Sequence, residues 1–302
     1  MKPGQFQFTW PVHGDHGWIE GKLLNDVLSG IRSKPDAYLV PFTGTGARLV
    51  KPLEATGLFR DFAQLEKTET AMLTFANDYG MLAAGSDVIL VSPPHFAPHS
   101  IATYTRVREK QSLKIIPLAE SSDFWANQIN AMHRAVQLWD AVSSTDPQRE
   151  LRRFIEWPDK TCVRYRSGSK ASGDWMEEWI AATVHFPELL ARLEYPDLVQ
   201  PAWRQLQRLV NRHLVEFAPC PQLLWDNGKL PLFTQPQNLI GGMWLQFARA
   251  IGGDRQYRTC PGCGHWFEVG GGRKRSDAQT CSPTCRQRKN RNPVGRARTR
   301  KR

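Results

Sequence analysis

Four cysteines near the C-terminal end place the strongest constraint on how this chain folds. They form two close pairs, Cys260-x2-Cys263 and Cys281-x3-Cys285, with 17 residues between the pairs. Two such pairs, brought together by a turn, supply the tetrahedral set of soft ligands that zinc requires. The sequence therefore predicts one structural Zn2+ ion held by Cys260, Cys263, Cys281 and Cys285.

The same cysteines would serve two disulfides or a redox dithiol only in an oxidising compartment or a thioredoxin-like βαβ context. The first 17 residues contain no apolar segment typical of a signal peptide. No run approaches the roughly 18 apolar residues of a membrane span. We therefore expect a cytoplasmic protein with no membrane segment, in which clustered cysteines bind metal. The isolated Cys162 and Cys220 are expected to be ordinary thiols.

The residues around the cysteines predict a treble-clef module over residues 254–292. Gly262 and Gly264 suit a tight knuckle around the first pair, and "HWFEV" after it alternates like a strand, with a turn at the glycines 270–272. Ser282 is a candidate N-cap and Pro283 a first helical residue, so the second pair opens a helix.

A site closed by four thiolates leaves no open coordination position for a substrate, which argues against metal catalysis. With four thiolates present, His265 is expected to lie at the surface or beside a ligand rather than on the metal.

Positive charge is concentrated in the same part of the chain. Residues 255–302 carry 14 Lys or Arg against two acids, whereas residues 1–254 carry 26 basic and 27 acidic side chains. Residues 293–302 are too polar to pack and are expected to form a flexible basic arm. Zinc next to a basic helix favours binding to nucleic acid, with DNA preferred. The candidate contacts are Arg273, Lys274 and Arg275 on the predicted turn, Arg286, Arg288, Lys289 and Arg291 on the helix, and Arg296 and Arg298 on the arm.

The rest of the chain predicts an α+β fold with a β-rich part over 1–120 and a mainly helical part over 121–253 packed with it. Short runs rich in branched residues predict strands near 5–10, 37–42, 47–50, 87–91 and 112–118. Apolar residues spaced by three or four predict helices at 68–79, 122–139, 147–157, 174–183, 186–193, 199–217 and 236–251. The first of these is expected to begin at Thr68 as N-cap and to end before Gly80, and Ser122 or Asp123 is expected to cap the second. Asn227-Gly228 predicts a hairpin turn.

Signs of an enzyme are weaker. His13, Asp15 and His16 with His95 and His99 offer a second set of metal ligands, but histidines in loops rich in Gly or Pro are more often surface residues. Thr43 to Gly46 lacks the Lys-Ser/Thr of a phosphate-binding loop, so a plain turn is preferred. The sequence therefore favours a protein that is not an enzyme, without deciding the question.

The stretch from Tyr257 to Arg288, "YRTCPGCGHWFEVGGGRKRSDAQTCSPTCRQR", resembles the C-terminal zinc finger of bacterial CGNR-type proteins. Upstream stretches, such as "MWLQFARAIGGDRQYR", are similar to landmarks of the bacterial proteins that carry this finger. The final cysteine is followed by Arg286-Gln287-Arg288 where that family has Gly-Asn-Arg. The resemblance implies zinc on the same four cysteines and a role as a stress-related transcription regulator.

Two further interpretations stay open beside nucleic-acid binding. In the first, the zinc holds a surface for a protein partner or a homodimer and the basic arm only aids solubility; in the second, the N-terminal region is an enzyme. Neither the ligand of the large region nor the oligomeric state follows from the sequence.

Overall fold

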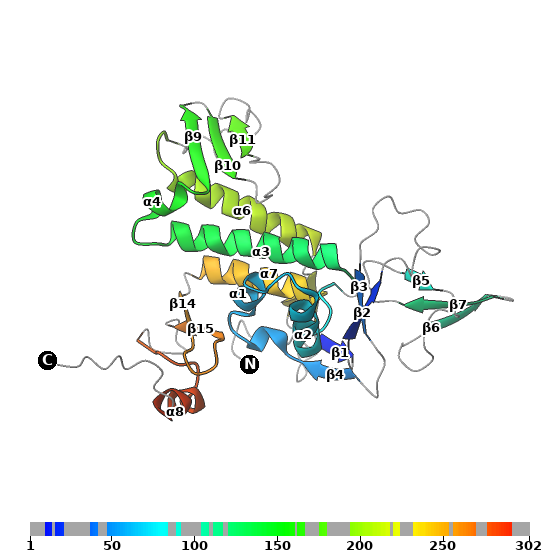
Figure 1. Ribbon diagram of the computed structural model, residues 1–302. Helices are drawn as coiled ribbons and strands as arrows, with labels where there is room; N and C mark the ends of the chain where they lie inside the picture. The colour runs from blue at the N-terminus through cyan, green and yellow to red at the C-terminus, as the bar shows by residue number, and fades with distance from the viewer. Residues whose placement is uncertain are drawn as a thin grey trace.

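The computed structural model has an α+β fold, in agreement with the prediction from the sequence (Figure 1). No helix within the described residues combines the length and apolar character needed to cross a membrane. The structure describes residues 10–13, 16–20, 37–41, 47–83, 89–91, 104–108, 111–116, 120–160, 162–166, 175–179, 194–217, 220–223, 232–253, 256–269 and 277–291.

Helix α3 (Ser122–Val142) runs through the middle of the molecule and organises its main core (Figure 1). The hydroxyl of Ser121 accepts a hydrogen bond from the amide of Phe124 at 3.0 Å, so the N-cap is Ser121 and not Ser122 or Asp123, the two predicted caps. The apolar stripe predicted for this helix is buried throughout, at Trp125, Ile129, Met132, Val136 and Trp139.

Helices α1 (Leu58–Ala63), α6 (Val199–Glu216) and α7 (Leu239–Gly252) are among those that pack directly against α3. Their buried side chains belong to the same core as those of α3. The largest fully buried side chains of this core are Trp125, Trp244, Phe59, Phe62 and Phe247. We call these four helices, with the elements packed on them, the helical body.

Helix α2 (Glu69–Tyr79) lies where the sequence predicts it and is bounded by the expected residues. The side chain of Thr68 accepts from the amide of Ala71 at 3.3 Å. Gly80, at the C-terminal end, has a φ of +92°, which a residue with a side chain rarely adopts.

Strands form small antiparallel sheets around the helices. Their bounds are β1 (Trp10–His13), β2 (His16–Glu20), β3 (Ala37–Pro41), β4 (Ala47–Val50), β5 (Ile89–Val91), β6 (Tyr104–Arg108), β7 (Gln111–Ile116), β8 (Glu120–Ser121), β9 (Ile155–Asp159), β10 (Cys162–Arg166), β11 (Trp175–Trp179), β12 (Cys220–Leu223) and β13 (Leu232–Gln235). Within the described ranges the pairings are β1-β4, β2-β3-β8, β5-β7-β6, β9-β10-β11 and β12-β13. The last pair is the hairpin predicted from Asn227-Gly228, whose turn lies outside the described residues.

Two predicted helices are wrong in part or in whole. The helix predicted at 147–157 is only one turn long, α4 (Pro147–Leu151), and is followed by strand β9. The helix predicted at 174–183 contains strand β11 instead. Both segments pair with β10, because a strand partner elsewhere in the chain outweighs a local helical preference. The helix predicted at 186–193 and the loop 43–46 lie outside the described residues.

A buried carboxylate fixes the start of α3 to the segment after α2. Glu120, only 3% exposed, accepts hydrogen bonds from the amides of Leu82 at 3.0 Å and Ala83 at 2.5 Å, one on each carboxylate oxygen. Leu82 is itself fully buried, and its carbonyl accepts from the amide of Ile240 on α7. Leu82, in the segment after α2, is therefore linked through its amide to the start of α3 and through its carbonyl to α7.

Replacing Glu120 by Gln should lower the free energy of unfolding by about 1–3 kcal/mol. An amide side chain offers one acceptor oxygen instead of two, so one buried backbone amide loses its partner. Denaturation in urea of the variant and of a Glu66→Gln control, in which the carboxylate is exposed, measures the difference. Equal losses in the two variants would contradict the role of Glu120.

Candidate metal centre

The first cysteine pair lies on a tight turn between two short strands, β14 (Gln256–Thr259) and β15 (Trp266–Val269). The amide of Cys260 donates to the carbonyl of His265 at 2.9 Å, and the amide of Gly264 donates to the carbonyl of Cys260 at 2.8 Å. Gly264 has a φ of +80°, so the turn requires glycine there. The hairpin therefore presents Cys260 and Cys263 at its tip, as the sequence predicts for a knuckle.

The second pair lies at the start of helix α8 (Pro283–Arg291). The hydroxyl of Ser282 accepts from the amide of Cys285 at 3.1 Å, which is the predicted cap. Knuckle and helix touch at Gly262, where an added Cβ would lie 2.6 Å from the carbonyl oxygen of Cys285. Any side chain at position 262 would separate the two pairs.

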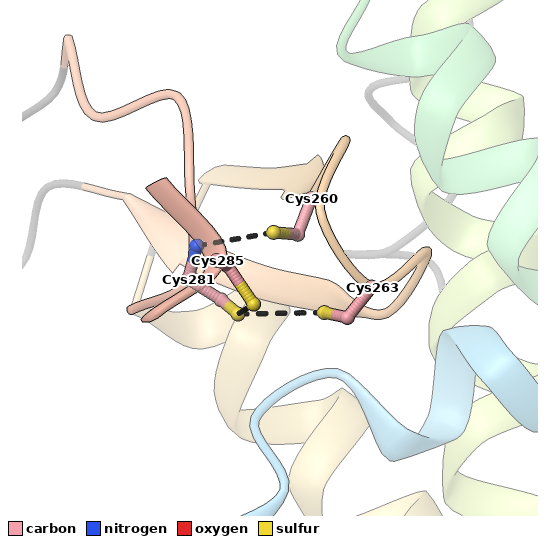
Figure 2. Close-up of side chains that lie close together, drawn as sticks. All are labelled: Cys260, Cys263, Cys281 and Cys285. Carbon is pink, nitrogen blue, oxygen red and sulfur yellow. Dashed lines mark hydrogen bonds between the residues drawn. The ribbon is translucent and has the colours of Figure 1, made fainter. Parts of the chain in front are cut away.

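The four thiols converge on one point (Figure 2). All four sulfur atoms lie within 4.8 Å of one another, and Cys281 Sγ is 3.4 Å from the sulfur atoms of both Cys263 and Cys285. A tetrahedron with metal–sulfur bonds of about 2.3 Å has sulfur–sulfur edges of about 3.8 Å. A disulfide would need a sulfur–sulfur distance of about 2.05 Å, and none of the four cysteines forms one. The cluster has the size of a four-thiolate metal site.

Backbone amides and neighbouring thiols set very different proton affinities within the cluster. Burial opposes ionisation of Cys260, but the amides of Cys281, at 3.3 Å from its sulfur, and Gly262 outweigh it and lower the pKa of Cys260 to about 6. Burial, the three neighbouring thiols and the charge of Cys260 raise the pKa of Cys281 to about 12. Burial also raises the pKa of Cys263. Without a cation, these surroundings favour the thiolate at Cys260 and the protonated thiol at Cys263 and Cys281.

The ligand cysteines also form the centre of a small separate core. Cys260, Phe267, Val269 and Cys285 are buried together, with Cys263, Ala278 and Cys281 packed around them. So few apolar side chains cannot stabilise a domain without another crosslink. We call this unit, residues 256–269 and 277–291, the metal module.

The metal module packs on helix α1 through the start of β15. Trp266 packs so closely on Gly57 that a Cβ added to Gly57 would lie 2.7 Å from the Cβ of Trp266. The indole Nε1 of Trp266 donates a hydrogen bond to Gln64 Oε1 at 3.4 Å. His265 Nδ1 lies 3.4 Å from Asp61 Oδ2 while its side chain stays 65% exposed. His265 is therefore a contact to the helical body and not a fifth ligand, in line with the prediction.

The structure describes only part of the predicted nucleic-acid surface. Arg286 and Arg288 are exposed on α8, as expected. Lys289 and Arg291 belong to the same helix, but their side chains are outside the described residues. Arg273, Lys274, Arg275, Arg296 and Arg298 also lie outside them.

One exposed cation of the metal module is missing from the prediction. Arg258 projects from β14 with an exposed side chain, whereas its neighbour Tyr257 is half-buried. Alternation along β14 is the signal that would have identified Arg258.

The alternative metal site near the N-terminus gains no support from His16, the one member whose side chain the structure describes. His16 is buried, and both its amide and its Nδ1 lie within 3.0 Å of Asn77 Oδ1, which ties β2 to α2. The side chains of His13, Asp15, His95 and His99 lie outside the described residues. Across the described ranges, the four-cysteine cluster is the one group that can hold a metal ion.

No family model, no curated protein and no solved structure matches the chain. The fold and the cluster define an α+β protein with a C-terminal four-cysteine metal module. The resemblance to CGNR-type zinc fingers stays a prediction.

The purified protein should contain one bound metal ion per chain, and Cys281→Ser should abolish it because three thiolates leave the tetrahedron open. Elemental analysis after gel filtration measures the ratio. Cys162→Ser is the matched control, because Cys162 is a buried cysteine on β10 that forms no disulfide and lies outside the cluster. A metal content that Cys162→Ser lowers as much as Cys281→Ser does would contradict this assignment.

Proposed function

We propose that this chain is a zinc-dependent nucleic-acid-binding protein, in the manner of a bacterial regulator, and that DNA is its preferred target. The observation that carries the proposal is the placement of exposed arginines on α8, the helix whose first turn contains Cys285. Metal binding would order this helix and its basic side chains together.

Zinc is the metal that best fits the donor set. Four thiolates in a tetrahedron are typical of structural zinc, whereas magnesium and calcium require oxygen ligands. The same four thiolates would occupy every position around the ion, so the metal would build structure rather than activate water. A reducing compartment such as the cytoplasm would keep the cysteines available.

The helix that carries the basic side chains lies apart from the helical body. Figure 1 shows α8 on the far side of the metal module from α3, with β14 and β15 between them. The face of the module toward the body is occupied by Trp266 and its contacts with α1. A duplex could therefore reach Arg286 and Arg288 without displacing the body.

The chemistry of this surface supports contacts with phosphates rather than with bases. Arginine binds phosphate through charge and bidentate hydrogen bonds, and each contact releases counterions from the duplex. The basic residues that follow α8 in the sequence would add contacts of the same kind. We infer general affinity for the backbone of DNA, with the large N-terminal region acting as a sensing or assembling part.

Binding to a random DNA duplex should weaken steeply as salt rises, with a slope that depends on the α8 arginines. Each lost phosphate contact reduces the slope of log K against log salt by about 0.9. Arg286→Gln with Arg288→Gln should therefore reduce it by roughly 2. Fluorescence anisotropy at several salt concentrations measures these slopes, with an RNA duplex of the same sequence in parallel.

The double variant Arg152→Gln with Arg153→Gln is the matched control, because it removes two exposed arginines of the body. Its slope should equal that of the wild type, and equal slopes in all three proteins would contradict the proposal. The alternative of a protein-interaction module predicts no salt-sensitive binding to either duplex and a dimer, seen by sedimentation, that the α8 substitutions dissociate.

A further inference from the structure

A buried arginine lies at the junction between the helical body and the metal module. Arg60, on α1, is 6% exposed and forms a bidentate ion pair with Asp140 at the end of α3, at 2.7 and 3.0 Å. Its guanidinium carbon also lies within 6 Å of four aromatic ring centroids. These rings are Trp139 and Trp266 at 4.8 Å, Tyr257 at 5.4 Å and Phe59 at 5.7 Å.

The four rings come from both sides of the junction. Phe59 and Trp139 belong to α1 and α3 of the body. Tyr257 and Trp266 belong to β14 and β15, three residues before Cys260 and three residues after Cys263. The strands that hold the knuckle therefore also hold half of the aromatic cage around Arg60.

The aromatic cage matters because the charge of Arg60 is buried and the other groups around it offset only part of the cost of removing it from water. Asp140 keeps 51% of its side chain exposed, and Arg60 Nε is buried without a hydrogen-bond partner. Cations attract aromatic faces more strongly when water is excluded, so the two rings of the module stabilise the buried charge. If the metal module separated from the helical body, Arg60 would lose its contacts with Tyr257 and Trp266.

The metal module, in turn, depends on its ion. A two-stranded hairpin of four-residue strands is at best marginally stable alone, and small modules around four thiolates are typically unfolded without metal. Loss of the ion would release Tyr257 and Trp266 from their fixed positions beside the knuckle. The cage would then keep only the rings and the carboxylate of the body.

We propose that Arg60 couples the metal site to the helical body, so that the ion stabilises the body and the body raises the affinity of the four cysteines for the ion. Coupling of this kind is reciprocal: whatever free energy the ion adds to the body, the docked body adds to metal binding. The body then responds to metal loss although it contributes no ligand. This inference does not depend on whether the protein binds nucleic acid.

The direct test is the metal affinity of the full chain, measured by competition with a chromophoric zinc chelator. Arg60→Gln removes the cation from the cage and should weaken zinc binding by about tenfold, within the usual range of coupling between sites. Arg153→Gln is the matched control. Arg153 also lies over an aromatic ring, Phe154 at 4.9 Å, and pairs with Glu150, but it is remote from the metal module. Its affinity for zinc should equal that of the wild type.

Thermal unfolding, followed by circular dichroism of the helices, tests the reciprocal effect. Removal of zinc with a chelator should lower the Tm of the wild-type body by several degrees, about 2–4 °C for each kcal/mol lost in a chain of this size. The same treatment should lower the Tm of Arg60→Gln by less. Glu120→Gln weakens the body away from the module and should leave zinc affinity unchanged, which distinguishes coupling from general destabilisation.

If Arg60→Gln does not fold, Asp140→Asn and Trp266→Phe decide the question. The first weakens the ion pair at a half-exposed carboxylate, and the second replaces one ring by a smaller one. Both should lower zinc affinity relative to Arg153→Gln. The proposal would be overturned if a folded Arg60→Gln protein bound zinc with wild-type affinity. It would also be overturned if Asp140→Asn and Trp266→Phe both did so.

Discussion

The burial of four closely spaced thiols is the constraint on which the C-terminal part of this structure depends. The backbone places four sulfur atoms within 4.8 Å of one another, and the surrounding amides favour the thiolate of Cys260. Burial and the neighbouring thiols hold Cys263 and Cys281 toward the protonated form. A divalent cation removes the conflict, because it lets all four ionise and binds them in one geometry. The small core of the metal module forms around the same four side chains.

The consequences of that site extend to the rest of the fold through α1. This short helix packs on α3 and α7 with its apolar face and against Trp266 at its start. Arg60 joins the two contacts, since its charge is paired with Asp140 and surrounded by rings from both units. Helix α8, which carries exposed arginines, lies on the far side of β14 and β15 from α3 (Figure 1). Metal, body and basic helix therefore form one connected arrangement.

Features that depend on neighbouring residues could be predicted from the sequence, and features that depend on distant ones could not. Thr68 and Gly80 bound α2 as predicted, and the spacing of the cysteines identifies all four members of the cluster. Strands β9 and β11 were mistaken for helices because only their pairing with β10 defines them. Arg60 carries no local signal, because its pairing partner comes from α3 and two of its rings from the metal module.

X-ray absorption at the zinc edge of the purified full chain tests the central claim most directly. A four-thiolate site requires four sulfur neighbours at about 2.3 Å and no nitrogen or oxygen in the first coordination sphere. That spectrum would establish the ion around which the module folds. A shell containing nitrogen or oxygen ligands at about 2.0–2.1 Å, or a protein that binds no zinc under reducing conditions, would contradict the account.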